Sequence, residues 1–338
     1  MTLQRRFFLM GMAGSWIGRL QAAETQAQAR STASRLVFGL ISPRAVAQTR
    51  ANWAPFVDRL STACEHSVDT QVYESQGDLV SAFKAGEIDM AWMGNAPALE
   101  VVEAGAGEVF AQMVTEDGSL GYKSLLIVQS TTALKTLKDV IDHAPALRFG
   151  DGDPKSTSGF LVPLYFAFQK NGVTSTQALF KSVEVGSHQQ NLSKVAKGVV
   201  DVATANNEEL AFFQRDFPDL AKHIRVVWES PLIPQSPLLW KVGLPYVLKQ
   251  KIRKFVTGFA ARDPLEKQIL LTVNGLSRFR PSTNRQLVPI ADLEMFKTRQ
   301  AINNDQTLSK DQRLARISEA IERGSRLELK LKLSPQSP

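Results

Sequence analysis

The chain has 338 residues, 43% hydrophobic and 22% charged, a globular composition with enough length for two ordinary domains. Its formal net charge is +7, but no block of Lys and Arg is dense enough to predict a nucleic-acid surface. Cys64 is the single cysteine, which excludes an intrachain disulfide, and the four histidines have no spacing that resembles a zinc site. We therefore expect stability to come from the core, with no metal or other cofactor.

The first 29 residues have the features of an export signal. Arg5 and Arg6 precede an apolar run over residues 7–18 that is too short to span a bilayer, and small residues follow it. Cleavage after Ala29 or after Ala23 fits a signal peptidase. The arginine pair suits the twin-arginine route as well as the ordinary secretory route, and the sequence leaves both open. We predict a signal peptide over residues 1–29 and a soluble periplasmic protein without a lipid anchor.

Beyond residue 30, strand-like and helix-like patterns alternate. Short apolar or β-branched runs predict strands over residues 35–40, 68–73, 88–93, 124–128, 147–150, 200–203 and 224–228. Apolar residues at helical spacing predict helices over residues 48–63 and 78–85, and Asn95 is placed to cap a third helix. This alternation predicts an α/β protein with much parallel sheet.

The strongest chemical feature is the run Ser156-Thr157-Ser158, which follows a Gly-Asp-Pro turn and precedes an apolar helix predicted over residues 158–169. The start of a helix offers unpaired N–H groups and a partial positive charge, and hydroxyls beside them suit a phosphate-like group. On this feature alone, an ordinary Ser/Thr cap without a ligand is the better explanation. Asp151 and Asp153 are expected to shape the preceding turn rather than to exchange protons.

Several longer runs extend this feature into a pattern that covers nearly the whole chain after the signal. In chain order they are DMAWMGN at 89–95, VFAQ at 109–112, DGSLGY at 117–122, FGDGDPKSTSGFLVP at 149–163, VDVAT at 200–204, SPLIP at 230–234 and QLVPI at 286–290. With these runs the chain resembles the periplasmic phosphonate-binding proteins of phosphonate ABC transporters.

The resemblance implies a two-lobed, hinged periplasmic binding protein of the type II-like α/β class. Residues 30–124 and 230–290 would then form the first lobe, and residues 125–229 the second. The lobes should meet around residues 121–129 and 227–239. A helical extension over residues 291–338 is expected to pack on a lobe or on a second subunit, which would give a homodimer.

The resemblance also implies a ligand site. Its phosphonate oxygens would be held by Tyr122, Ser156, Thr157 and Ser158. His188 would lie near this group, and Glu208 would meet an amino group on the ligand. Two positions depart from the family pattern, because Gln76 replaces a tyrosine and Ser236 replaces an aspartate at the amino end. We therefore expect a phosphonate, phosphite or phosphate ester with a short or neutral tail rather than 2-aminoethylphosphonate. Trp92 is interpreted as a core residue.

The function that follows is that of the solute-binding component of an ABC importer, which delivers a small phosphonate-like anion to a membrane permease. Two alternatives remain open at this point. The protein could sense the same ligand for a membrane receptor, or it could be an enzyme on this fold. The sequence shows no nucleophile elbow, metal-ligand cluster or cofactor loop, so we expect no catalysis and assign no catalytic residue.

Overall fold

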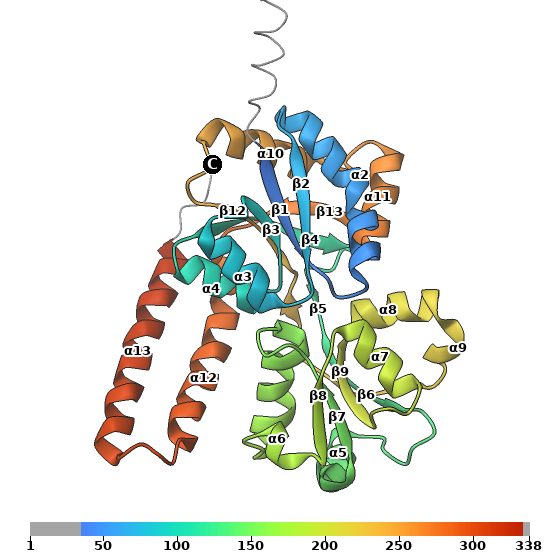
Figure 1. Cartoon of the computed structure of the whole chain (residues 1–338), viewed down its shortest axis with the longest axis vertical. Helices are drawn as coiled ribbons and strands as arrows, with labels where there is room; N and C mark the ends of the chain where they lie inside the picture. The colour runs from blue at the N-terminus through green and yellow to red at the C-terminus, as the bar shows by residue number, and fades with distance from the viewer. Residues whose placement is uncertain (1–34, 334–338) are drawn as a thin grey trace, which may run out of the picture.

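The computed structural model describes residues 35–333, so the predicted signal peptide over residues 1–29 lies outside the described part. Two mixed β-sheets with flanking helices form two lobes, and a two-stranded ribbon joins them (Figure 1). We call the lobe with the six-stranded sheet the first lobe and the lobe with the five-stranded sheet the second lobe. This arrangement confirms the predicted two-lobed α/β fold.

The sheet of the first lobe has the strand order β13-β4-β12-β3-β1-β2. Its strands are β1 (Leu36–Ile41), β2 (Val68–Tyr73), β3 (Met90–Trp92), β4 (Gly107–Thr115), β12 (Pro237–Lys241) and β13 (Leu276–Pro281). Its helices are α2 (Val46–Cys64), α3 (Gln76–Ala85), α4 (Asn95–Glu103), α10 (Tyr246–Gly258) and α11 (Pro264–Asn274). Since β1 pairs in parallel with β2 and β3, these three strands end at the same edge of the sheet.

The sheet of the second lobe has the strand order β10-β6-β9-β7-β8. Its strands are β6 (Ser124–Gln129), β7 (Arg148–Asp151), β8 (Ser182–Val185), β9 (Val202–Asn206) and β10 (Ile224–Glu229). Its helices are α5 (Leu137–His143), the 3₁₀ turn η1 (Ala144–Ala146), α6 (Thr176–Leu179), α7 (His188–Ala196), α8 (Asn207–Asp216) and α9 (Pro218–Ala221). Parallel pairing is confined to β7, β8 and β9 here, and to β1, β2 and β3 in the first lobe.

The expectation of much parallel sheet was therefore only half right. Both sheets are mixed because strands that enter or leave a lobe through the ribbon add antiparallel pairs. The other departure lies in the helix predicted over residues 158–169. It consists of the π-helical segments η2 (Thr157–Leu161) and η3 (Leu164–Phe168), followed by the 3₁₀ turn η4 (Gln169–Asn171). Leu161 N–H donates to the Ser156 carbonyl, five residues back, at 3.0 Å, which gives this first turn its wide form.

The ribbon between the lobes consists of β5 (Gly121–Tyr122) and β11 (Ile233–Pro234), which pair antiparallel. The chain passes from β4 through β5 to β6, and it returns from β10 through β11 to β12. A Cβ atom on Gly121 would lie 2.5 Å from the Ile233 carbonyl oxygen, so only glycine fits at this crossing. Both crossings lie within the predicted segments 121–129 and 227–239.

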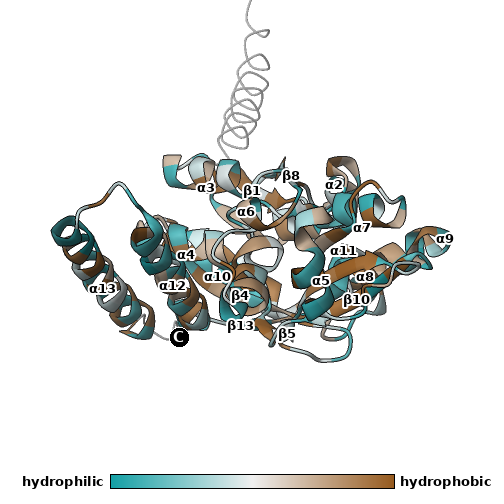
Figure 2. Cartoon of the chain, turned by 90° about the horizontal axis from the view of Figure 1, so that it is seen from below, coloured by the Kyte–Doolittle hydropathy of each residue, from teal (hydrophilic) through white to brown (hydrophobic). Residues whose placement is uncertain are grey.

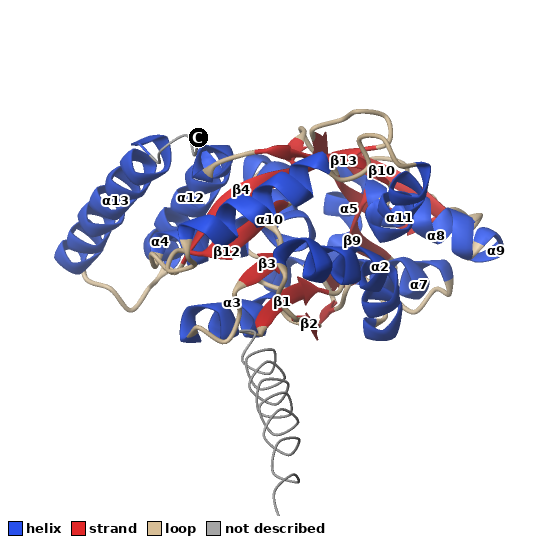
Figure 3. Ribbon diagram, turned by 90° about the horizontal axis from the view of Figure 1, so that it is seen from above, coloured by secondary structure: helices blue, strands red, loops and turns tan. Residues whose placement is uncertain are grey.

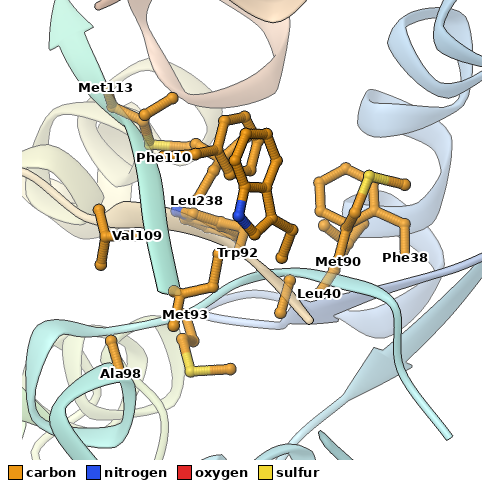
Figure 4. Close-up of a cluster of buried hydrophobic side chains, with 14 of the residues drawn as sticks. Phe38, Leu40, Met90, Trp92, Met93, Ala98, Val109, Phe110, Met113 and Leu238 are labelled. Carbon is orange, nitrogen blue, oxygen red and sulfur yellow. The ribbon is translucent and has the colours of Figure 1, made fainter. Parts of the chain in front are cut away.

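Each lobe has its own core. The first lobe is filled by aromatic side chains such as Trp53, Phe56 and the stacked pair Phe110 and Trp240, whose ring centroids are 4.2 Å apart. Figure 4 shows how side chains of β1, β3, β4 and β12 meet in this cluster. In the second lobe, alternate residues of β6 fill two clusters, one on each face of the sheet. The core of each lobe fixes the position of its sheet and therefore of the sheet edge that faces the other lobe.

The C-terminal extension is a helical hairpin of α12 (Val288–Asn304) and α13 (Lys310–Leu333), preceded by the 3₁₀ turn η5 (Asn284–Leu287). It stands at one side of the molecule, opposite α8 and α9 (Figure 3). The Arg323 guanidinium forms two hydrogen bonds with the Glu103 carboxylate, at 2.5 and 2.6 Å, which fasten α13 to the first lobe. Within residues 35–333 no helix combines the length and the apolar character needed to cross a bilayer.

Candidate ligand-binding cleft

A cavity of about 90 Å³ lies between the two lobes. It is lined by all the predicted site residues, namely Gln76, Tyr122, Ser156, Thr157, Ser158, His188, Glu208 and Ser236. A single water needs roughly 10–15 Å³ of such space, and pockets for drug-sized ligands start near about 300 Å³. The cavity therefore has room for a small polyatomic ligand. The residues were predicted from separate motifs, and the fold brings them together.

Five helical elements begin at this cavity. The first lobe contributes the starts of α3 and α4, and the second lobe contributes those of η2, α7 and α8. Each helix start is the positive end of a helix dipole. Some of the first N–H groups already have acceptors, as in α3, where Gln76 N–H donates to Asp153 Oδ2 and Gly77 N–H donates to Ser75 Oγ. Among the described residues that line the cavity there is no lysine or arginine. Four carboxyl groups line it, those of Glu74, Asp153, Glu208 and Glu209, so the features of the lining that favour an anion are the helix starts and the uncharged donors beside them.

The Ser156-Thr157-Ser158 run lies where two of these helix starts meet. Ser156 caps η2, since its Oγ accepts from Gly159 N–H at 3.0 Å. Thr157 Oγ1 accepts from Ala96 N–H of α4 at 2.7 Å, so a hydroxyl of the second lobe caps a helix of the first lobe. The N-cap residue of α4 itself is Gly94, which has no side chain to do this. The Thr157 hydroxyl proton stays available to a ligand.

His188 and Tyr122 complete this end of the cavity. His188 Nε2 lies 3.0 Å from Ser158 Oγ, and burial lowers the pKa of this imidazole to about 4. Burial also raises the pKa of the Tyr122 phenol, an effect that a hydrogen bond with Ser158 partly offsets. At neutral pH both side chains are therefore uncharged, and both can donate a hydrogen bond to an oxyanion.

The other end of the cavity contains Glu208, whose Oε1 accepts from Gln235 Nε2 at 2.5 Å and whose Oε2 accepts from Asn274 Nδ2 at 3.5 Å. Burial raises the pKa of Glu208 to about 7. Within residues 35–333, Gln76 Oε1 and Trp92 Nε1 are buried without a hydrogen-bond partner. Trp92 was interpreted as a core residue at a strand end that faces the cleft; it is 5% exposed and lines the cavity. A donor and an acceptor thus remain unsatisfied beside the site.

Hydrogen bonds across the cleft hold the lobes in a closed arrangement. Gln76 N–H of the first lobe donates to Asp153 Oδ2 of the second at 2.9 Å. Asp153 also accepts from Lys155 N–H at 2.8 Å, so it shapes the turn as expected and bridges the lobes as well. Asp151 does not line the cavity. The expectation for Asn95 was wrong, because it lies inside α4 and its Nδ2 donates to the Pro234 carbonyl of the ribbon at 2.7 Å.

Sequence reasoning missed several lining residues, among them Gly94, Asn206, Glu209 and Asn274. Asn206 carried a usable signal, because it follows a buried strand and caps α8. Asn274 had no local sequence signal that could have identified it. A larger hollow of about 470 Å³ lies between the C-terminal hairpin and α4, and no predicted site residue lines it. Within residues 35–333, no group of three or more His, Cys, Asp or Glu side chains is placed to hold a metal.

Two α/β lobes joined by a pair of crossing strands, with a polar cavity at their junction, define the class of two-lobed periplasmic binding proteins. Comparison with known families makes the assignment specific. The chain belongs to the family described as ABC transporter, phosphonate, periplasmic substrate-binding protein, whose model matches residues 38–287. The family resemblance seen in the sequence motifs is thereby confirmed.

Individual relatives agree with this assignment. The chain is 36% identical over 293 residues to the phosphonates-binding periplasmic protein of Escherichia coli, covering 87% of this chain and 86% of that one. A binding protein component of an ABC phosphonate transporter from Pseudomonas aeruginosa is 34% identical, with a TM-score of 0.81 over 88% of this chain and 98% of that one. PhnD1 of Prochlorococcus marinus, solved with methylphosphonate, is 20% identical with a TM-score of 0.71 over 79% of this chain and 100% of that one, and it supports the fold alone.

Proposed function

We propose that this chain is the solute-binding component of an ABC importer and that it takes a phosphonate, or a related small phosphorus oxyanion, into the cavity between its lobes. The observation that carries this proposal is the convergence of five helix starts and a cluster of neutral hydrogen-bond donors on one small cavity. Family membership supports the same ligand class, as does the name of the Escherichia coli relative. The loaded protein then delivers the anion to a membrane permease.

At the anion end, the oxygens are held by the side chains of Tyr122, Ser156, Thr157, Ser158 and His188. These groups are uncharged donors, so the anion keeps its charge while it exchanges water for fixed hydrogen bonds. The helix dipoles supply the attraction that a lysine or arginine would otherwise give.

At the tail end, Glu208, Gln76 and Ser236 form a pocket for a short, neutral tail. The Glu208 carboxyl is already hydrogen-bonded to Gln235 and Asn274, and burial makes its charged form costly. Gln76 and Ser236 bring no charge to balance an ammonium group. The small cavity volume favours the same choice.

The wider assignments follow from this role. The family is one of substrate-binding proteins, and we infer that this chain catalyses no reaction. Residues 1–29 direct it to the periplasm. We propose that the lobe boundaries lie at residues 124/125 and 229/230 and that the extension begins at residue 291. A sensing role beside a membrane receptor is the competing function, and genes for a permease and an ATPase next to this one would favour transport.

Calorimetric titration tests the proposal. Methylphosphonate, 2-aminoethylphosphonate, phosphite, phosphate and glycerol phosphate are each titrated into the mature protein at one pH and salt concentration. We expect one site per chain and the tightest binding for a phosphorus oxyanion with a short neutral tail. If no phosphorus oxyanion binds, the proposed function is wrong. Release of inorganic phosphate from glycerol phosphate or from either phosphonate would instead indicate an enzyme.

A further inference from the structure

An arginine of the first lobe is buried against a glutamate of the second lobe behind the cavity. Arg44, in the loop after β1, donates from Nε to Glu209 Oε2 and from Nη2 to Glu209 Oε1, both at 2.8 Å. Each side chain is only 4% exposed. The Arg44 guanidinium also lies 3.6 Å from the centroid of the Phe212 ring, which belongs to the same helix as Glu209. This is a two-pronged, desolvated ion pair between the lobes.

The pair is connected to the ligand cavity by one further side chain. Arg44 Nη2 also donates to Asn274 Oδ1 at 2.9 Å, and Asn274 Nδ2 donates to Glu208 Oε2 at 3.5 Å. Glu208, Glu209 and Asn274 line the cavity, whereas Arg44 stands behind them. A change in the ion pair can therefore alter the hydrogen bonding of Glu208 through the side-chain amide of Asn274.

Opening and closing change the environment of this ion pair more than that of an ordinary surface pair. When the lobes separate, Arg44 and Glu209 can both return to water. When the lobes close, both lose their hydration, and only the complete pair with all its hydrogen bonds compensates that loss. A closed cleft with one partner missing contains an uncompensated buried charge. Closure of the lobes is therefore favourable only in the arrangement that pairs Arg44 with Glu209.

We propose that Arg44, Glu209 and Asn274 form an interlobe latch, which stabilises the closed cleft and positions Glu208 at the tail end of the ligand. Arg44 is thus a positioning residue for ligand binding although it does not line the cavity. The part of this inference that concerns ligand affinity rests on the proposed function. The part that concerns lobe closure does not.

A double-mutant cycle tests the latch. Arg44→Met and Glu209→Leu are made singly and together, and methylphosphonate affinity is measured by calorimetry. Each single variant should lose about tenfold or more in affinity, because it leaves a buried charge unpaired. The double variant should lose less than the sum of the two singles, since apolar side chains of similar volume can replace a buried pair.

Small-angle scattering of the ligand-free proteins provides the second readout. The ligand-free native protein is expected to populate both open and closed forms, so Arg44→Met, which disfavours the closed form, should have a larger radius of gyration than the native protein or the double variant. Arg148→Met is the matched control, because Arg148 forms a two-pronged pair with Asp201 inside the second lobe, at 2.7 and 3.0 Å. That control is expected to lower the urea unfolding midpoint but to change neither the radius nor the affinity.

The outcomes separate the two proposals. If Arg44→Met binds within about twofold of the native protein and has the same radius, the latch is wrong. Additive losses in the double variant would also overturn it. If the native protein binds none of the phosphorus oxyanions, the proposed function fails, and the radius of the ligand-free variants alone then decides whether the latch exists.

Discussion

Removal of the Thr157 hydroxyl should separate the anion-binding contribution of this residue from its contribution to folding. Thr157 is 1% exposed, and its Oγ1 accepts from Ala96 N–H across the cleft at 2.7 Å. In the Thr157→Ala variant, the ligand loses a charge-assisted hydrogen bond worth about 1.5–3 kcal/mol. The closed cleft also buries Ala96 N–H without an acceptor, which costs about 1–3 kcal/mol.

Both losses apply to the closed, ligand-bound state, because water can reach Ala96 N–H when the lobes separate. The affinity for methylphosphonate should therefore fall by at least about 2.5 kcal/mol, roughly 60-fold. The free energy of unfolding of the ligand-free protein should fall by less than about 2 kcal/mol, the upper cost of a lost helix cap. Thr157→Ser keeps the hydroxyl and should bind nearly as well as the native protein.

Calorimetry gives the affinities, and urea unfolding gives the stabilities of the same preparations. The reasoning would be refuted by a Thr157→Ala variant that binds within about threefold of the native protein. It would be refuted equally by a Thr157→Ser variant that loses as much affinity as Thr157→Ala, because the backbone position rather than the hydroxyl would then matter.

Three further predictions concern the tail pocket, pH and assembly. Gln76→Tyr with Ser236→Asp should raise the affinity ratio of 2-aminoethylphosphonate to methylphosphonate about tenfold or more, through a charge-assisted bond and cation–π attraction; a native preference for the amino compound would contradict the proposed pocket. Burial raises the pKa of Asp151 to about 7, so the stability from this group is complete at low pH and is lost as pH rises through about 7. The free energy of unfolding, measured with urea, should therefore fall less between pH 5.5 and 8.5 for Asp151→Asn than for the native protein. Equal pH profiles would show that ionisation of Asp151 does not cause the loss of stability. The α13 side chains Leu314 and Ile321 are 58% and 48% exposed on a largely hydrophilic helix (Figure 2), and we propose that they pack in a homodimer. Sedimentation should show that the native protein is a dimer and that the Leu314→Glu with Ile321→Glu variant is a monomer. A monomeric native protein would exclude the proposed dimer.

Most of the strands that the sequence predicted contain a continuous apolar or β-branched run, whereas β2, with the sequence VDTQVY, does not. β1 and β6 contain such a run, and both are buried on both faces. β4, with the sequence GEVFAQMVT, mixes polar and apolar residues without a clear period, so local pattern did not predict it. It lies between β12 and β13, which come from much later in the chain. Its burial is thus a consequence of the return crossing, which pattern alone does not reveal.

The candidate site likewise contains some residues that a local sequence pattern reveals and others that it does not. The start of η2 carries its own local signal, because a hydroxyl-rich run after a Gly-Asp-Pro turn is recognisable in the sequence. The acceptor role of Thr157 is not recognisable, since its partner is a backbone N–H that any residue except proline would offer at position 96. Arg44 and Glu209 are 165 residues apart, and neither lies in a motif. Contacts across the closed cleft depend on how two separately folded lobes meet.

The positions of the helix starts explain why an anion should close this cleft. Three of the five belong to the second lobe and two to the first, so an anion on the open second lobe meets only three. Closure adds the start of α4, worth about 0.3–2 kcal/mol toward an anion, while the start of α3 is already paired with the Asp153 carboxylate of the second lobe. A ligand shifts an equilibrium only by its differential affinity for the two states, so the closed state should gain roughly 1.5-fold to 30-fold. An uncharged molecule of similar shape, such as dimethyl sulfone, does not gain this attraction to the helix dipoles. Small-angle scattering at saturating methylphosphonate should therefore show a smaller radius of gyration than scattering at the same concentration of dimethyl sulfone. Equal radii would mean that shape, rather than the charge that the helix starts recognise, drives closure.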